Sequence, residues 1–142
     1  MKQWKWRLSL VLLLHVALIL LMAFPIGAVL RFGHPDPAVK IYRTFAYFDP
    51  GVLGMSGNPF PFLTAVLTAL AFLLLVWMLL RQTPSSRLYA ACFGCTVAAA
   101  VTSVLALFLL SRVSVAGVTI TALLVASGIL QHLTRPLLAA EE

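Results

Sequence analysis

Two cysteines in the tetrapeptide CFGC come nearest to a reactive motif in this sequence. Cys92 and Cys95 are separated by two residues and lie near the expected start of a long apolar helix. Thiols at this spacing can form a disulfide, and the positive end of a helix favours the reactive thiolate. The pattern therefore allows thiol redox chemistry. The alternative is that both cysteines are small, apolar residues that pack between helices.

The rest of the cysteine pattern argues against the redox interpretation. Small four-helix, quinone-linked thiol oxidoreductases are similar in general architecture, but they relay electrons through a second cysteine pair. This chain has only two cysteines. The pair is also expected near the cytoplasmic face, where thiols stay reduced. Packing is therefore the favoured interpretation.

His15 is a second candidate, because it interrupts an apolar stretch that carries no formal charge. An ionisable group inside a membrane span is by default a functional hypothesis. Three interpretations stay open: a structural histidine bonded to a Ser or Thr, a proton or substrate site, and a metal or haem ligand. Neither His34 nor His132 stands at ligand spacing from it. The sequence therefore predicts no metal site and no cofactor.

Acidic residues are missing from every long apolar stretch. Small proton-coupled multidrug transporters of similar size depend on an intramembrane glutamate, which this chain lacks. No Ser–His–Asp set and no carboxylate pair is apparent either. Asp36 and Asp49 flank one short segment, where each has an expected capping or turn role. These absences make an enzyme the less favoured interpretation.

Composition places the chain in a membrane. Hydrophobic residues make up 62% of it and charged residues 10%, whereas a soluble domain carries about 25% charged residues. The net charge of +6 could indicate nucleic acid. However, the positive residues stand singly at the ends of apolar runs, where they mark helix ends and attract anionic headgroups. The expected partner is therefore the lipid bilayer and not nucleic acid.

Four apolar stretches are long enough to cross a bilayer. A helix needs about 20 apolar residues to cross roughly 30 Å of hydrocarbon. Backbone amides in lipid must also be satisfied internally, which favours helices. The sequence thus predicts an all-α fold, a four-helix transmembrane bundle in one domain of residues 1–142, with spans at residues 8–30, 60–80, 88–110 and 113–133.

The first stretch also has features of a secretory signal peptide. Lys2, Lys5 and Arg7 precede it, but it is longer than the usual 7–15 residues and its cleavage site is poor. We therefore expect an uncleaved span. With the N-terminus inside, six Lys and Arg residues are cytoplasmic and four are outside, which follows the positive-inside rule. The predicted location is the inner (plasma) membrane, multi-pass, with both termini cytoplasmic.

The polar segment between the first two spans predicts a short amphipathic helix at residues 37–48. Asp36 is a suitable cap, and a proline follows at the first helical position. Apolar and aromatic residues recur at helical spacing, while Lys40 and Arg43 lie on the opposite side and would face lipid phosphates. Asp49-Pro50-Gly51 is expected to end the helix. It would plug the bundle, act as a lipid- or substrate-facing lid, or bind a partner.

Small residues in the last two spans favour close helix packing. They repeat every four positions in the third span and recur on one stripe of the fourth. Such residues let membrane helices approach closely and form occasional interhelical hydrogen bonds. Whether they close the bundle or a homo-oligomer stays open. The predicted packing residues are Ala91, Gly94, Cys95, Ala98, Gly117 and Thr121.

The segment Thr44–Leu80 resembles small uncharacterised bacterial membrane proteins with four spans. The shared features are an aromatic YF element, a glycine-containing loop, an FP dipeptide and a Thr-bearing span. The resemblance implies a bacterial origin and no catalytic residue. The favoured function is a non-enzymatic structural or accessory subunit that binds another membrane protein. The alternatives are an oligomeric transporter or channel component, and a thiol oxidoreductase that uses Cys92 and Cys95.

Overall fold

The computed structural model describes residues 3–82, 85–110 and 112–139. These residues are mostly helical, with four long helices, a short helix and a β-hairpin. In chain order the elements are α1 (Gln3–Ala23), β1 (Ala28–Phe32), β2 (Ile41–Phe45), α2 (Pro50–Ser56), α3 (Phe60–Arg81), α4 (Ser86–Leu109) and α5 (Val115–Ala139).

The four long helices have 21 to 25 residues each and are long and apolar enough to cross a membrane. At about 1.5 Å per residue, even the shortest spans roughly 30 Å of hydrocarbon. The chain therefore has the architecture of a small multi-span membrane protein. The second and third spans begin and end within a few residues of their predicted bounds. The last span begins within a few residues of its predicted start but continues to Ala139.

The predicted bounds of the first span were wrong. The helix begins at Gln3 and ends at Ala23, not at residue 30. Pro25 explains the early end, because the residue before a proline is disfavoured in helical conformation and proline has no N–H to donate. The apolar residues that follow form strand β1 instead.

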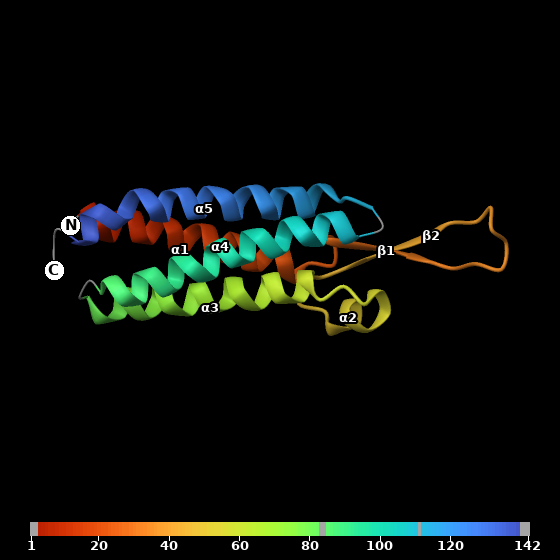
Figure 1. The fold of residues 1–142 in the computed structure, drawn as a ribbon, viewed down its shortest axis with the longest axis horizontal. Helices are drawn as coiled ribbons and strands as arrows, with labels where there is room; N and C mark the ends of the chain where they lie inside the picture. The colour runs from red at the N-terminus through yellow and green to blue at the C-terminus, as the bar shows by residue number, and fades with distance from the viewer. Residues whose placement is uncertain (1–2, 83–84, 111, 140–142) are drawn as a thin grey trace.

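The long helices form a bundle in which each packs against two neighbours. Helix α3 packs against α4, α4 against α5, α5 against α1, and α1 against α3. Figure 1 shows α1 starting, α3 meeting α4 and α5 finishing at one end, which we call the terminal end. The hairpin and α2 lie at the opposite end, which we call the hairpin end.

The predicted amphipathic helix at residues 37–48 does not form. Residues 41–45 are strand β2, which pairs antiparallel with β1 so that Ala28 lies opposite Phe45 and Phe32 opposite Ile41. The Asp36 carboxylate accepts the N–H of Ala38 at 2.9 Å, two residues on, which is a turn and not a helix cap. The short-range helical spacing was overridden by pairing with β1. The fold is consequently not purely all-α.

The Asp-Pro-Gly sequence that was expected to end this helix instead starts another. The Asp49 carboxylate accepts the N–H of Gly51 at 2.8 Å, and Pro50 is the first residue of α2. Proline suits that position because its missing N–H would have no helical partner there. The signal was therefore assigned to the wrong end of a helix.

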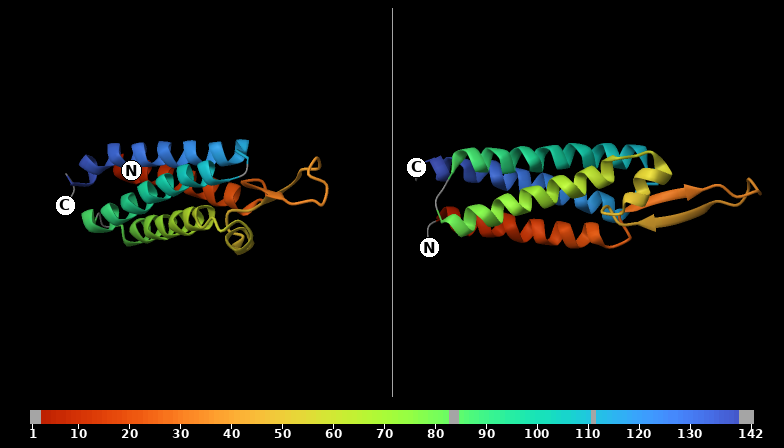
Figure 2. Two further views of the ribbon diagram at one scale, coloured as in Figure 1. Left: turned by 45° about the vertical axis from the view of Figure 1, so that its right-hand side comes forward. Right: turned by 90° about the horizontal axis from the view of Figure 1, so that it is seen from below.

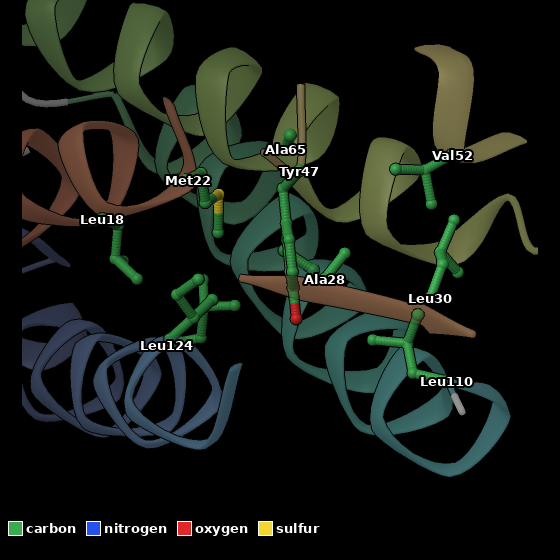
Figure 3. Packing of buried hydrophobic residues seen from close by; sticks show 11 residues of the cluster. Leu18, Met22, Ala28, Leu30, Tyr47, Val52, Ala65, Leu110 and Leu124 are labelled. Atoms are coloured by element: carbon green, nitrogen blue, oxygen red, sulfur yellow. The ribbon is translucent and has the colours of Figure 1, made fainter. Parts of the chain in front are cut away.

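Tyr47 closes the bundle at the hairpin end (Figure 3). Its side chain is completely buried, and its N–H donates to the carbonyl of Met22 at 2.9 Å. A Cβ at Gly27 would lie 2.8 Å from the Tyr47 ring, and one at Gly117 would lie 3.3 Å from its hydroxyl oxygen. The Tyr47 side chain thus fits between two glycines, with its ring at Gly27 and its hydroxyl at Gly117. At position 27, only a residue without a side chain allows this approach.

Candidate functional site

A cluster of polar side chains lies inside the bundle around His15, which is completely buried at about the middle of α1. Its Nδ1 is 2.9 Å from the carbonyl oxygen of Val11 and 3.4 Å from the hydroxyl of Ser127 on α5. Its Nε2 is 3.4 Å from the hydroxyl of Thr96 on α4. The amide nitrogen of Gln131 donates to that same hydroxyl at 2.9 Å. Helices α1, α4 and α5 thus meet through polar contacts.

Two hydrogen-bond acceptors in this cluster lack a close donor. A carbonyl only accepts, so Nδ1 of His15 carries the proton and Nε2 is an acceptor in the neutral ring. Thr96 has one hydroxyl proton, which it donates to the carbonyl of Cys92 at 3.1 Å. Nε2 of His15 is left at 3.4 Å from that oxygen, and Oε1 of Gln131 is buried without a hydrogen bond. Two buried acceptors therefore compete for donors that the neighbouring side chains do not supply.

The polar contacts continue toward the terminal end through Tyr89 and Cys92. The Tyr89 hydroxyl donates to the backbone carbonyl of Gln131. The Cys92 thiol is completely buried and lies 3.6 Å from the carbonyl of Ala71. Cys95 is only partly buried, and both thiols are free. The less accessible of the two cysteines is therefore the first one, which a redox pair would use as its nucleophile.

The hairpin half of the bundle has polar pairs of a different kind. The hydroxyls of Thr64 and Thr102 are 2.8 Å apart and join α3 to α4. Those of Ser103 and Thr121 are 2.7 Å apart and join α4 to α5. Each pair also has a backbone acceptor for its remaining proton, for example the carbonyl of Gly117 for Thr121. These groups are matched donor to acceptor, as buried polar groups in lipid require.

The loop after β2 contains one polar group that is less well matched. The Tyr47 hydroxyl lies near that of Ser103 but makes no hydrogen bond. Burial raises the pKa of the Tyr47 phenol, because its anionic form would lose hydration, and the nearby Ser103 hydroxyl partly opposes this shift. Tyr47 is therefore neutral and acts through the packing of its ring.

The predicted packing residues lie at different places on α4 and α5. Ala91 and Gly94 are exposed on α4, and Cys95 and Ala98 are half-buried. The fully buried face of α4 runs beside them, through residues such as Cys92, Thr96 and Ala99. Gly117 is buried against Leu107 of α4, and Thr121 bonds to Ser103.

Lys40 and Arg43 lie on the exposed outer part of the hairpin. Lys40 precedes β2, and the Arg43 guanidinium lies 5.8 Å from the centroid of the Phe32 ring, across the hairpin.

The sequence alone pointed to His15 but not to its partners Thr96, Ser127 and Gln131. Their spacing contained a usable indication, because Ser127 and Gln131 are four residues apart in an apolar helix and so lie on one face.

Among the residues that the structure describes, no three His, Cys, Asp or Glu side chains lie close enough together to hold a metal ion. Comparison of the chain with protein-family models, with curated proteins and with solved structures finds no match. The resemblance of Thr44–Leu80 to small bacterial membrane proteins therefore stays a prediction. What the structure supports is the coarser statement that this is a protein with four helices of transmembrane length.

Proposed function

We propose that this protein is a non-enzymatic accessory subunit that binds another membrane protein through the outer part of its β-hairpin. The observation that carries the proposal is the exposure of β2. In this strand four of five residues are exposed, on both faces. Figure 2 shows the hairpin extending well beyond the ends of α3, α4 and α5, so it stands outside the layer that the bundle occupies.

The exposed part of the hairpin has the chemistry of a protein contact. Val39, Ile41 and Tyr42 are 42%, 37% and 40% exposed. Apolar and aromatic side chains of this kind are typical of the centre of interfaces. A two-stranded sheet is also only marginally stable alone, and each of its edges presents unpaired backbone groups to which a further strand can bind.

The base of the hairpin is held firmly, which favours binding. Ala28, Val29 and Leu30 of β1 are buried, and the Ser114 hydroxyl of the α4–α5 connection donates to the carbonyl of Gly27 at 2.6 Å. On the second strand of the base, the N–H of Tyr47 donates to the carbonyl of Met22 and holds this strand against α1. A binding element held in one conformation loses less entropy on association.

The proposal includes an orientation in the plasma membrane. Lys5, Arg7, Arg81, Arg87 and Arg135 belong to the terminal end, and no Asp or Glu among the described residues lies there. The positive-inside rule then assigns this end to the cytoplasm and the hairpin to the outer side. The exposed rings of Trp6 and Trp77 suit the interfacial belt at the same end.

Site-specific photo-crosslinking in native membranes tests this function. A benzophenone side chain at position 42 is expected to form a discrete adduct with one membrane protein. The same probe at position 108, where Phe108 is highly exposed on α4, should react mainly with lipid. Co-purification of the adduct's partner should be lost in a Val39→Ser, Ile41→Ser variant and kept in Val118→Ser on α5. Identical products at positions 42 and 108 would refute the proposal.

The buried cluster around His15 favours a second candidate, a transporter or channel component. A histidine whose acceptor nitrogen lacks a close donor can accept a hydrogen bond from a hydroxyl-bearing substrate or take up a proton. A proton flux into proteoliposomes that His15→Leu abolishes and Ser103→Ala preserves would support it. Absence of flux in the unaltered protein would exclude proton transport by this chain alone.

The thiol oxidoreductase has no comparable support. Cys92 is completely buried and its thiol faces a backbone carbonyl of α3, whereas a reactive thiolate needs access and positive surroundings. The accessory function therefore remains the preferred proposal.

A further inference from the structure

A groove of about 350 Å³ runs between α4 and α5 on the outside of the bundle, from about its middle toward the terminal end. Its walls are almost entirely apolar, and its lining extends from residue 93 to 101 on α4 and from 124 to 133 on α5. The groove exists because Ala100 and Gly128 have small side chains or none. A Cβ at Gly128 would meet no atom within 4 Å, so the space above it is open.

The terminal end of the groove is bordered by cationic and aromatic side chains. The rings of Phe93 and His132 lie with their centroids 6.2 Å apart across it. His132 and Leu133 also line an adjoining hollow that contains Arg135. On the other flank, the Arg7 guanidinium donates to the carbonyl of Leu133 at 3.1 Å. The apolar groove thus ends beside positively charged side chains.

The length of the groove indicates what fits it. At about 1.5 Å per residue, nine steps along α5 from residue 124 to 133 cover roughly 14 Å. This is about half of the roughly 30 Å hydrocarbon core, the depth of one leaflet. A packed transmembrane helix would follow the whole bundle, whereas a lipid chain ends near the bilayer midplane. The positive charge beside one end favours a ligand that carries an anionic group there.

We propose that this groove binds one acyl chain of an anionic phospholipid, with the lipid phosphate held at Arg135 and His132. The site is independent of the hairpin and of its proposed partner. Arg135 supplies the charge, Gly128 leaves the space for the chain, and the ring pair of Phe93 and His132 marks the boundary between headgroup and hydrocarbon.

Native mass spectrometry of the full chain in detergent tests the site, with phosphatidylglycerol and phosphatidylcholine of identical acyl chains as probes. One phosphatidylglycerol should be retained more strongly than phosphatidylcholine. Arg135→Gln should weaken retention of phosphatidylglycerol about fivefold, the effect of one basic residue at a membrane surface. Arg81→Gln is the matched control, because Arg81 belongs to the same end but stacks on Trp77 of α3, and it should leave retention unchanged.

A second pair of variants tests the groove itself. Gly128→Leu should fill it and reduce retention of both lipids. Gly94→Leu adds the same side chain at a position that is also open but does not line the groove, and it should leave retention unchanged. Thermal unfolding of both variants confirms that they fold.

Equal retention in Gly128→Leu and Gly94→Leu would overturn the proposal. So would equal effects of Arg135→Gln and Arg81→Gln, because that result would show only a general attraction of the cationic end. A dimer that Gly128→Leu dissociates would assign the groove to a second copy of the chain, and this too would overturn it.

Discussion

The hydroxyl pairs in the hairpin half of the bundle and the cluster around His15 differ in how well their buried polar groups are matched. In the hairpin half, Thr64 with Thr102 and Ser103 with Thr121 form short hydroxyl pairs, at 2.8 and 2.7 Å. Near the middle of the bundle, His15 lies 3.4 Å from Thr96, and Gln131 has an acceptor with no hydrogen bond. A matched pair holds helices together, while an unmatched acceptor in lipid costs free energy.

This difference separates polar pairs that stabilise the bundle from polar groups that are candidates for function. The hairpin half is closed by the Tyr47 ring, and apart from the Tyr47 hydroxyl the hydroxyls described there are paired. The middle of the bundle, around His15, contains acceptors that lack a close donor, and the groove beside it is open to lipid. Substitutions at four places test this difference, and those at Tyr47 should change the stability most.

Removal of the Tyr47 ring should have the largest effect. Tyr47→Ala leaves a cavity among residues of α1, β1 and α5, and should lower the free energy of unfolding by about 3–5 kcal/mol. Tyr47→Phe should change it by less than about 0.5 kcal/mol, because the lost hydroxyl makes no hydrogen bond. Unfolding in mixed micelles by denaturing detergent measures both. Equal losses would show that the hydroxyl and not the ring stabilises this end.

A methyl group at Gly27 should have the next largest effect. Gly27→Ala places a Cβ 2.8 Å from the Tyr47 ring and should cost about 1–3 kcal/mol through overpacking. In a Tyr47→Ala background the same substitution should cost far less, since the ring is gone. A cost that persists in the double variant would contradict the fit of the ring between glycines.

Double-mutant cycles compare the hairpin half with the cluster around His15 directly. Ser103→Ala with Thr121→Ala should give a coupling of at least about 0.6 kcal/mol, the average for hydrogen bonds between membrane helices. His15→Leu with Thr96→Val should give a smaller coupling, because the two atoms lie 3.4 Å apart. The same unfolding assay provides both values. A larger coupling for His15 with Thr96 than for Ser103 with Thr121 would show that the cluster around His15 is as well matched as the hydroxyl pairs.

Substitutions on the outer hairpin should affect stability least. Tyr42→Ser or Val39→Ser should change the free energy of unfolding by less than about 0.5 kcal/mol, as for ordinary surface positions. Both should nevertheless weaken partner binding. A large loss of stability would mean that these side chains support the fold and are not a free binding surface.

The spans could be predicted from sequence because lipid leaves few choices. An apolar run of transmembrane length must satisfy its own backbone, so α3 and α4 were placed within a few residues. The hairpin could not be predicted, because its residues carry helical spacing and the strand partner of Ile41–Phe45 lay in a run assigned to the first span. Pro25 stands inside that run and ends α1 at Ala23, so the apolar run is longer than the helix that it contains.

The candidate site was predictable only in part. His15 was identified because an ionisable residue in an apolar run is rare. Thr96, Ser127 and Gln131 could not be joined to it, since one sequence does not show which faces of α1, α4 and α5 meet. The groove could not be predicted from the sequence either, because it depends on the space that Gly128 leaves beside α4.

The position of Tyr47 has a consequence for biosynthesis. Its hydroxyl lies beside Gly117, and the Ser114 hydroxyl holds the base of the hairpin at Gly27; both residues are near the start of α5. A ribosome synthesises α5 after the other helices described here, so a nascent chain without α5 lacks part of the packing around Tyr47. The hairpin is therefore expected to reach its final position only after α5 has joined the bundle.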